Sequence, residues 1–531
     1  MVLVSFFLKI FICAFCCSTY ISIAGEHFID NKIVSVLEKT EFAEHLSQNG
    51  SENGYGVKNG SDQGVPESSR IKMTDKPRLL VLTDIGGDPD DIQSLRRLLV
   101  YSNEFRIMGF IATATGGRQE KLRIHEDLIN NAISDYELVR DNLLLHASGY
   151  PTAKELREVV RGGEANRGVD NLVSGHSTSG SHHIINVVDA SDEPVCIVIW
   201  GGAHDLAQAL LDVKTVRTPD ELNYFLSKIR VYAIADQDKI SDTQGTGEWI
   251  RKNFTGLKYV EAGPPWMVVM AASFRGMYQN ESAGGDHPVL SLTEPGIELL
   301  NDQNWVESNV LPWGPLGAGY PFNVNQNPNA PRNTKGVKEG DTPSWFYFLQ
   351  HGMNNPEQPE WGGWGGRFQH QSGNHYTDAQ DNHWSRNMDG SLRMKWTVAR
   401  WREAFQNDFA ARMRWCKLRY DEANHNPVAV IDKDDSKDIL VRNVVQGKKI
   451  TLDATASYDP DGDTPSFKWW IYTEASSSTG IIRKNNSSTV KIEIPESSPA
   501  GGDVHVILEV TDDGYPKLYS YRRVILKVMN P

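Results

Sequence analysis

The sequence predicts an α/β domain with a mostly parallel, doubly wound β-sheet, followed by an all-β, immunoglobulin-like sandwich. Two patterns support this fold class. From about residue 76, short apolar runs alternate with helix-like segments, as in parallel sheets that carry helices on both faces. After residue 422, apolar and polar residues mostly alternate, which is typical of half-buried antiparallel strands. The 531 residues are also too many for one small domain.

The α/β domain is expected over residues 76–422. Its first strand is the continuous apolar run 78–84, and the segment 91–102 then repeats apolar residues at helical spacing. Further strand-like apolar runs lie at 105–114, 142–148, 195–202, 228–236 and 257–263. Helix-like segments lie at 154–161, 204–213, 248–254 and 396–417. In sheets of this kind ligands bind beyond the carboxyl ends of the strands, so the functional residues are expected there.

The sandwich is expected over residues 423–531. Six runs in this region have strand character and are separated by turn residues: 427–431, 448–457, 467–472, 489–495, 503–514 and 521–528. Within it, the loop DPDGD (459–463) is either a Ca²⁺ loop or a tight turn, and the turn is the favoured interpretation.

The amino-terminal 24 residues are predicted to be a secretory signal peptide, because a long apolar stretch precedes a small-x-small site at 22–24. The alternative is a signal anchor that stays in the membrane. Residues 25–75 are predicted to be a flexible polar linker, since 48–70 is rich in Gly, Ser and Asn. No later segment reaches the roughly 20 apolar residues that a membrane span needs. We therefore expect a secreted, extracellular or lumenal protein without a stable membrane span in its mature form.

Three of the five cysteines lie in this leader, which leaves Cys196 and Cys416. They either form one disulfide or remain two buried thiols. N-glycosylation tripeptides that begin at Asn49, Asn59, Asn253, Asn280 and Asn486 support export and a glycoprotein.

The net charge excludes one class of partner. The chain has 54 Lys+Arg against 68 Asp+Glu, a formal net charge of −14. A general nucleic-acid binder needs a basic face to neutralise phosphates, so no nucleic-acid partner is expected.

The segment TDIGGDPDD (83–91) is the most informative motif. Asp84, Asp88, Asp90 and Asp91 crowd the loop between the first strand and its helix. Carboxylates this close repel one another unless a cation compensates them, and Ca²⁺ prefers oxygen ligands. A capped helix start after a Gly/Asp/Pro turn is the alternative, but capping needs one carboxylate and not four.

This motif resembles the amino-terminal aspartate motif of nucleoside hydrolases. The chain resembles more closely the nucleoside-hydrolase-like branch that includes secreted bacterial cellulose-binding proteins with a carboxy-terminal β-sandwich. The likeness covers about residues 77–530. It includes WGGAHDLA (200–207), DQD (236–238) with WIRKNF (249–254), GPLG (314–317) and EGDTPS (339–344).

The resemblance implies a Ca²⁺ site and assigns roles to its residues. Asp84 and Asp91 would be metal ligands, and Asp84 would also accept a proton from the attacking water. Asp90 would contact sugar hydroxyls. The backbone carbonyl of His204 and the carboxylate of Asp341 would complete the ligand set. Asp286, in the segment DHP (286–288), is the alternative to Asp341.

The sequence also departs from the family pattern. Gly86 stands where the family has an aspartate, and the Asn/Glu/Asn motif that clamps ribose has no clear match. Asp236, Asp238, Trp249 and Asn253 occupy the comparable region and are the candidate substrate-binding residues. The metal site is thus better supported than a nucleoside substrate.

Two functions follow from these observations. The first is a secreted Ca²⁺-dependent hydrolase of N-glycosyl or related glycosidic bonds. The alternative is a non-catalytic protein that binds a cellulose-like polysaccharide on the same scaffold. Seven tryptophans within 345–415 are equally consistent with a carbohydrate cleft and with internal packing. The partner is in either case a sugar-containing small molecule or a polysaccharide.

Overall fold

The structure is a computed structural model. It describes residues 70–87, 89–113, 123–166, 168–238, 244–263, 277, 298–321, 323–324, 334–382 and 390–531. Residues 63–531 form one compact unit. The predicted signal peptide and most of the predicted linker lie outside the described residues.

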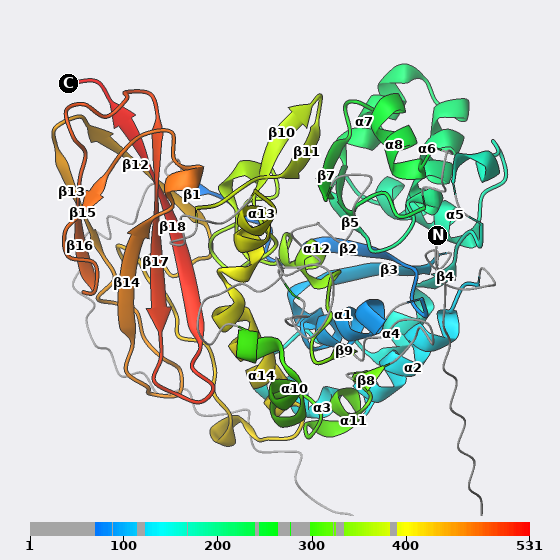
Figure 1. The fold of residues 1–531 in the computed structure, drawn as a ribbon, viewed down its shortest axis with the longest axis horizontal. Coiled ribbons are helices and arrows are strands. Elements are labelled where there is room, and N and C mark those ends of the chain that lie inside the picture. Colours follow the sequence, from blue (N-terminus) through cyan, green and yellow to red (C-terminus); the bar gives the residue numbers. More distant parts are fainter. Residues whose placement is uncertain are drawn as a thin grey trace, which may run out of the picture. The chain divides into compact units, whose positions relative to one another are not determined.

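The α/β domain is built on an eight-stranded sheet with the order β10-β11-β7-β6-β5-β2-β3-β4 (Figure 1). All neighbouring strands are parallel except β10 and β11, which pair antiparallel. The strands are β2 (Arg78–Thr83), β3 (Arg106–Ala112), β4 (Val160–Gly162), β5 (Val195–Ile199), β6 (Ile229–Ile234), β7 (Lys258–Ala262), β10 (Phe368–Ser372) and β11 (His375–Asp378). The mostly parallel sheet predicted from the apolar runs is confirmed.

Helices cover both faces of this sheet. They are α1 (Pro89–Val100), α2 (Glu126–Glu137), α3 (Arg140–His146), α4 (Ala153–Glu158), α5 (Ser179–Asp189), α6 (His204–Val216), α7 (Pro219–Ser227), α8 (Thr246–Asn253), α10 (Gln303–Asn309), α11 (Gly314–Ala318), α12 (Thr342–Phe346), α13 (Gly390–Ala399) and α14 (Arg402–Trp415). Short strands β8 (Asn323–Val324) and β9 (Thr334–Lys335) pair with each other.

The central strand β2 shows how the sheet separates two cores. Its residues are all buried, and alternate side chains point to opposite faces. Leu79 and Val81 join the core formed with α1, α2 and α14, whereas Leu80 and Leu82 join the core formed with α5 to α8. A strand buried on both faces needs a continuous apolar sequence, which is what the run at 78–82 provides.

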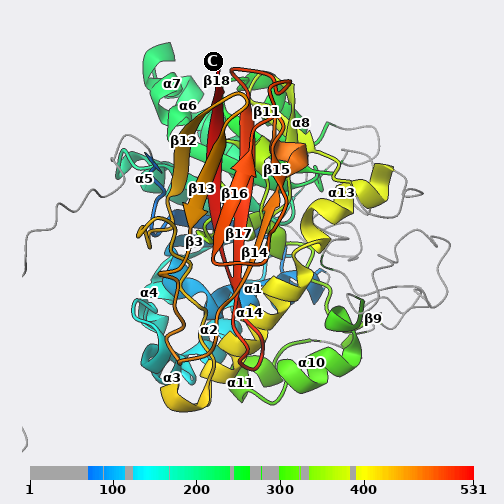
Figure 2. The same cartoon turned by 90° about the vertical axis from the view of Figure 1, so that its left-hand side faces the viewer.

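The second domain is a β-sandwich (Figure 2). One sheet has the order β1-β12-β18-β17-β14 and the other β13-β16-β15. The strands are β1 (Arg70–Ile71), β12 (Ile439–Val445), β13 (Lys449–Asp453), β14 (Ser466–Ile471), β15 (Ile481–Ile482), β16 (Thr489–Glu493), β17 (Asp503–Thr511) and β18 (Tyr519–Met529). The predicted sandwich is confirmed, and its strands pair antiparallel apart from the parallel pair β12–β18.

The predicted linker ends earlier than residue 75. Arg70 and Ile71 form β1, which pairs with Leu440 and Ile439 of β12. The Met73 amide also donates to the Asp438 carboxylate at 2.9 Å. The chain therefore contributes an edge strand to the sandwich before it enters the α/β domain, a long-range pairing that local composition does not indicate.

Two other local predictions differ from the structure. The run 142–148 lies largely in helix α3, because Leu143 is buried while Leu144 and Leu145 are exposed, a pattern that one helix face accommodates. Residues 427–431 form no extended strand and contribute isolated bridges, Val428 with Tyr458 and Ile431 with Asp434. The strand in that part of the sandwich is instead β12, which the sequence interpretation passed over.

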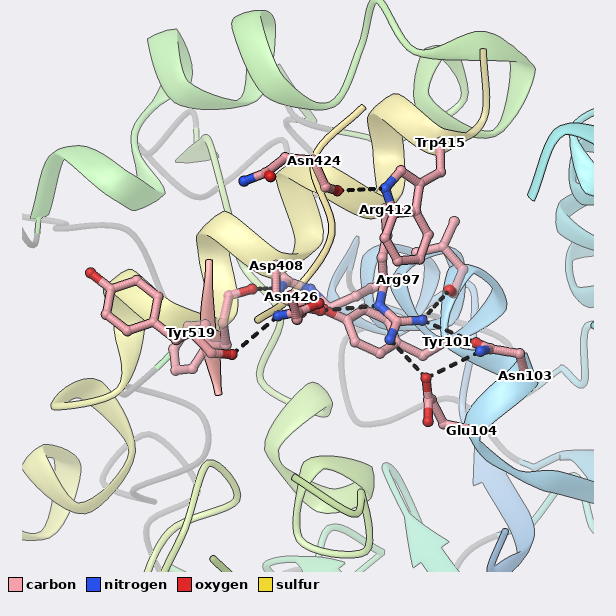
Figure 3. Close-up of polar contacts among 12 residues, drawn as sticks. Arg97, Tyr101, Asn103, Glu104, Asp408, Arg412, Trp415, Asn424, Asn426 and Tyr519 are labelled. Carbon is pink, nitrogen blue, oxygen red and sulfur yellow. Dashed lines mark hydrogen bonds and ion pairs between the residues drawn. The ribbon is translucent and has the colours of Figure 1, made fainter. Parts of the chain in front are cut away.

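A buried polar network joins the two domains (Figure 3). Arg412 of α14 donates to Glu104 at 2.8 Å and to Asn103 at 3.0 Å, and its Nε donates to Asp408 at 3.1 Å. Asp408 also accepts from the amide of Asn426 at 3.0 Å, and the same amide donates to the Tyr519 carbonyl of β18 at 3.1 Å. The network fixes α14 between the α/β domain and the sandwich.

Cys196 and Cys416 are free, buried thiols. Burial raises the pKa of Cys196 to about 12, so its thiolate is disfavoured at neutral pH. Of the two alternatives, the structure has the pair of thiols. Among the described helices none is long and apolar enough to cross a membrane.

Candidate metal centre

The aspartate motif lies at the carboxyl end of β2, near the middle of the sheet. The chain moves from β2 to β3 on one side and later returns to β5 on the other, which makes this a topological switch point. Asp84 follows β2 directly, and Asp90 and Asp91 lie in the first turn of α1. The side chain of Thr83 donates to Asp91, and the Ile85 amide donates to Thr83 Oγ1 at 3.1 Å. Through these bonds the last residue of β2 fixes the position of the Asp91 side chain. Asp88 lies outside the described residues.

Gly86, which stands where the family has an aspartate, has a backbone conformation that suits glycine. Its φ of 100° is in the left-handed region that favours glycine. A Cβ at this position would lie 2.7 Å from Cδ2 of His125. The His125 ring therefore occupies the space that a side chain at position 86 would enter.

Asp341 reaches this loop from a distant part of the chain because α1 binds the segment that precedes it. Gln93 donates to the carbonyls of Pro321 at 2.6 Å and Gly336 at 3.1 Å, and its Oε1 accepts from the Lys338 amide at 2.6 Å. One helical turn later, Arg97 forms a fully buried ion pair with Glu339. Asp341 is the residue before α12, as the sequence predicts.

Glu339 is held by further neighbours. It accepts from the Tyr320 hydroxyl at 2.6 Å and from Thr342 Oγ1 at 2.9 Å. Gln93, Arg97 and Tyr320 are positioning residues that the sequence interpretation missed. The sequence carried a signal for two of them. Gln93 and Arg97 lie four residues apart in a helix whose residues are almost all buried, and buried polar side chains require hydrogen-bonding partners.

Asp90, Asp91 and Asp341 come together at this edge of the sheet. Each offers a carboxylate oxygen, and these oxygens all lie within 4.8 Å of one another. The exposed fractions of the three residues are only 3%, 3% and 1%. Buried like charges at this separation repel strongly, and a hard divalent cation with oxygen ligands is the usual compensation. The donor set therefore fits Ca²⁺.

Asp84 lies at the same edge but is not one of these three. Its carboxylate packs against the turn after β5, where a Cβ on Gly201 would lie 2.5 Å from Asp84 Cγ. Trp200 connects this turn to Asp341: its indole donates to Ser344 Oγ at 2.9 Å, and Ser344 Oγ donates to the Asp341 carbonyl at 2.6 Å. The ends of β2 and β5 and the start of α12 are thus held together.

Asp236 and Asp238 follow β6 at the same edge and are buried. Asp236 accepts from the amides of Gly247 at 2.9 Å and Glu248 at 2.8 Å, and Asp238 accepts from the Thr246 amide at 2.9 Å. Both carboxylates therefore anchor the amino terminus of α8. Burial, and then the neighbouring Asp236, raise the pKa of Asp238 to about 7. Asp238 also contacts the β5 turn, since a Cβ on Gly202 would lie 3.0 Å from its Cβ.

The remaining predicted residues lie on α6 and α8 or outside the described part of the chain. Trp249 is half-buried on α8 and packs on Phe254 with 5.6 Å between ring centroids. Asn253 is exposed at the far end of α8, where its amide donates to the Trp249 carbonyl at 2.9 Å. His204 is the first residue of α6, so its carbonyl is directed along the helix toward the amide four residues on. Asp286 lies outside the described residues.

A second acidic group lies in the sandwich and has a structural explanation. Oxygens of Asp459, Asp463 and Asp512 lie within 4.8 Å of one another. Asp459 Oδ1 accepts from the amides of Asp461 at 2.8 Å and Asp463 at 3.3 Å, which closes a turn. Asp512 accepts from Asn424 at 2.8 Å and from the Leu518 amide at 2.7 Å. These bonds match the predicted tight turn.

Comparisons with known proteins agree with this architecture. Residues 78–368 match the family described as cellulose-binding Sde182, nucleoside hydrolase-like domain, and residues 449–528 match the carboxy-terminal domain of the cellulose-binding protein Sde0182. No curated protein matches the chain.

Among solved structures, the chain is similar to a nucleoside hydrolase-related hypothetical protein from Saccharophagus degradans that is associated with carbohydrate metabolism. The two are 31% identical with a TM-score of 0.67, covering 86% of this chain and 100% of the other. The inosine-uridine preferring nucleoside hydrolase from Bacillus anthracis is 13% identical, with a TM-score of 0.30, and covers 61% of this chain and 100% of its own. The chain belongs to the family of the nucleoside hydrolase-like domain of cellulose-binding Sde182.

Proposed function

We propose that this protein is a metal-dependent hydrolase of N-glycosyl or related glycosidic bonds. The observation that supports the proposal most directly is the convergence of Asp90, Asp91 and Asp341, buried, at the carboxyl edge of a parallel sheet. Three carboxylates at a topological switch point, in a nucleoside hydrolase-like domain, fit a cation site that faces a sugar.

The proposed roles keep to the geometry of this chain. Asp91 and Asp341 would hold Ca²⁺, with Asp90 beside them to bind sugar hydroxyls. A bound cation would lower the pKa of a nearby water and orient the sugar. Asp84, at the same edge and directly after β2, would accept the proton of the attacking water. The Asp84 carboxylate packs against Gly201, and a side chain at position 201 would displace it.

Calcium titration and a hydrolysis assay test these roles separately. Isothermal titration calorimetry of Asp91→Ala should lose the Ca²⁺ bound by the unchanged chain. Hydrolysis of inosine or p-nitrophenyl β-ribofuranoside should require Ca²⁺, and Asp84→Asn should lower kcat by at least about 100-fold. Asp302→Asn is the matched control, because Asp302 caps α10 through the Trp305 amide at 2.7 Å. Unchanged calcium binding in Asp91→Ala would refute the metal site.

The second candidate function is binding of a polysaccharide without catalysis. It is favoured by Asp236 and Asp238, whose carboxylates accept bonds from α8 backbone amides instead of forming a sugar clamp. The family description also names cellulose binding. Retention of the full chain on insoluble cellulose, with no hydrolysis of any tested glycoside in the presence of Ca²⁺, is the result expected of this function.

An extracellular location is proposed with either function. It rests on the predicted leader and on the exposure of Asn253 and Asn486, two glycosylation asparagines within the described residues. The amino-terminal sequence and the glycan content of the secreted protein are the tests.

A further inference from the structure

A groove of about 910 Å³ lies between the helices α13 and α14 and the sandwich. Its floor is the sheet face formed by β14, β17 and β18, and its wall is the side of α14 that faces them. Figures 1 and 2 show α14 beside this sheet. The groove shares no described residue with the carboxylate group of Asp90, Asp91 and Asp341. Its volume lies in the range of sites that bind small molecules and short polymer segments.

The floor of the groove is formed by side chains that point to one face of the sheet. Alternate residues of a strand point to one face, and Ser466, Lys468 and Trp470 of β14 all line the groove. The strand register then places two rows of side chains across the floor. One row is Lys468, Glu509 and Tyr521, and the other is Ser466, Thr511 and Tyr519.

The wall is one face of a helix. Glu403 and Ala404 of α14 lie four and three residues before Asn407, so each shares a face with it, and all three line the groove. Trp401 precedes them. The Trp401 and Trp470 rings both line the groove and contact each other, with 5.7 Å between centroids and 38° between planes. Trp470 is only half-buried, and it therefore offers ring surface to a ligand.

Polar groups surround these rings. Lys468 lies 3.7 Å from Glu509, and burial raises the pKa of Glu509. Burial, and then a hydrogen bond to Glu403, raise the pKa of Tyr519. The charged lining residues are Arg400, Lys468, Lys517, Glu403 and Glu509. Because both signs occur almost equally, the groove favours neither a polyanion nor a cation. Flat rings beside mixed donors and acceptors suit an uncharged, polyhydroxylated ligand.

Both ends of the groove are fixed before any ligand arrives. At one end Asp381 accepts from Arg400 at 2.8 Å and from the Tyr472 hydroxyl of the sandwich at 2.6 Å. The Arg400 guanidinium lies 5.1 Å from the centroid of the Trp470 ring. At the other end the Asn407 amide donates to the Lys517 carbonyl at 3.0 Å. A groove whose walls are already joined loses little conformational entropy on binding.

We propose that this groove binds a chain of an uncharged β-glucan, with Trp470 as the stacking platform and Lys468, Glu509 and Asn407 as hydrogen-bonding partners. Pyranose rings with equatorial hydroxyls have apolar faces that stack on an indole and a polar rim that meets such partners. The inference rests on the polysaccharide binding proposed above and gives it a location that is separate from the metal centre.

The test measures binding of cellohexaose to the full chain by isothermal titration calorimetry. Trp470→Ala should weaken binding at least about tenfold. Ser466→Arg should weaken it similarly, because it places a long side chain in the groove from an exposed position without removing a packed residue. Trp313→Ala is the matched control: Trp313 is also half-buried, stacks against Arg414 with 4.8 Å from guanidinium to ring, and does not line the groove.

Each outcome decides the proposal. Weakened binding in both groove variants, with melting temperatures equal to that of Trp313→Ala, supports it. Cellohexaose affinity unchanged in Ser466→Arg overturns the location even if the chain still binds cellulose. A chain that prefers anionic polygalacturonate, or that binds no cellohexaose at millimolar concentration, overturns the ligand class. Asp91→Ala should retain cellohexaose binding while it loses Ca²⁺, which separates failure here from failure of the metal centre.

Discussion

Arg97 of α1 and Glu339 form an ion pair in which neither side chain has any exposed surface. Arg97 also lies over the Phe409 ring, 3.9 Å from its centroid, and donates to the Phe405 carbonyl at 3.2 Å. Because Glu339 is two residues before Asp341, this pair determines where the third carboxylate lies relative to Asp90 and Asp91. The metal centre thus depends on a contact between two segments that lie about 240 residues apart in the sequence.

Replacing Arg97 by Met should therefore destabilise the protein and weaken calcium binding together. Removal of one partner from a fully buried ion pair leaves an uncompensated charge and typically costs about 3–5 kcal/mol. Urea denaturation gives the free energy of unfolding, and calorimetry gives the calcium affinity. Lys154→Met is the control, since Lys154 and Glu158 pair on the surface at 3.8 Å and should contribute little. A stable Arg97→Met chain with unchanged calcium affinity would contradict this role.

Asp341→Asn should have opposite effects with and without calcium. In the metal-free chain it removes one of three negative charges that lie within 4.8 Å of one another, so the free energy of unfolding should rise by about 1–3 kcal/mol. With calcium present, the unchanged chain gains about 2.7 kcal/mol at 100 times Kd, and the variant should lose that gain. Thermal unfolding with EDTA and with CaCl₂ measures both effects, with Asp302→Asn as the control. A variant that is less stable than the unchanged chain in EDTA would show that Asp341 has a structural role instead.

Much of the fold followed from local sequence. The strands β2, β5 and β6 are apolar runs buried on both faces, and a run of that kind can be recognised without its neighbours. The placement of Asp90 and Asp91 in the first turn of α1 also followed from local sequence, because the Gly/Asp/Pro turn precedes a periodic helix.

The parts that sequence did not predict depend on distant partners. Nothing near Arg70 indicates that it pairs with β12, and nothing near Gln93 indicates that it binds the carbonyl of Gly336. The sequence likewise places Asp236 close to the sugar site, but only the fold shows that its carboxylate accepts from α8 amides. Short-range patterns report burial and turns, whereas the partner of a buried polar group is decided by the tertiary structure.

The protein should lose stability in acid partly through His505. This histidine of β17 is buried at the domain junction, where it accepts from the Arg523 guanidinium at 2.8 Å. Burial, followed by Arg523 and Lys527, lowers its pKa to about 2. The unfolded chain binds a proton near pH 6.5 that the folded chain does not bind, so stability is full above that pH and falls as the pH drops toward 2.

The slope from this one group is up to about 1.4 kcal/mol per pH unit. His505→Gln keeps an acceptor for Arg523 but cannot titrate, so its loss of stability between pH 7 and pH 5 should be smaller. Urea denaturation at both pH values measures the difference, with the exposed His370→Gln as the control. If His505→Gln and the unchanged chain lose the same free energy, His505 is not the group responsible.

The central claim is that Asp91 and Asp341 hold a cation and that Asp90, beside them, binds the hydroxyls of a sugar. The most direct measurement is a crystal structure of the protein grown with CaCl₂ and a ribose-like ligand, with anomalous data to locate calcium. We predict an anomalous peak about 2.3–2.6 Å from carboxylate oxygens of Asp91 and Asp341, with the ligand hydroxyls next to it and to Asp90. Calcium bound only elsewhere, or no anomalous peak among these aspartates, would contradict the account.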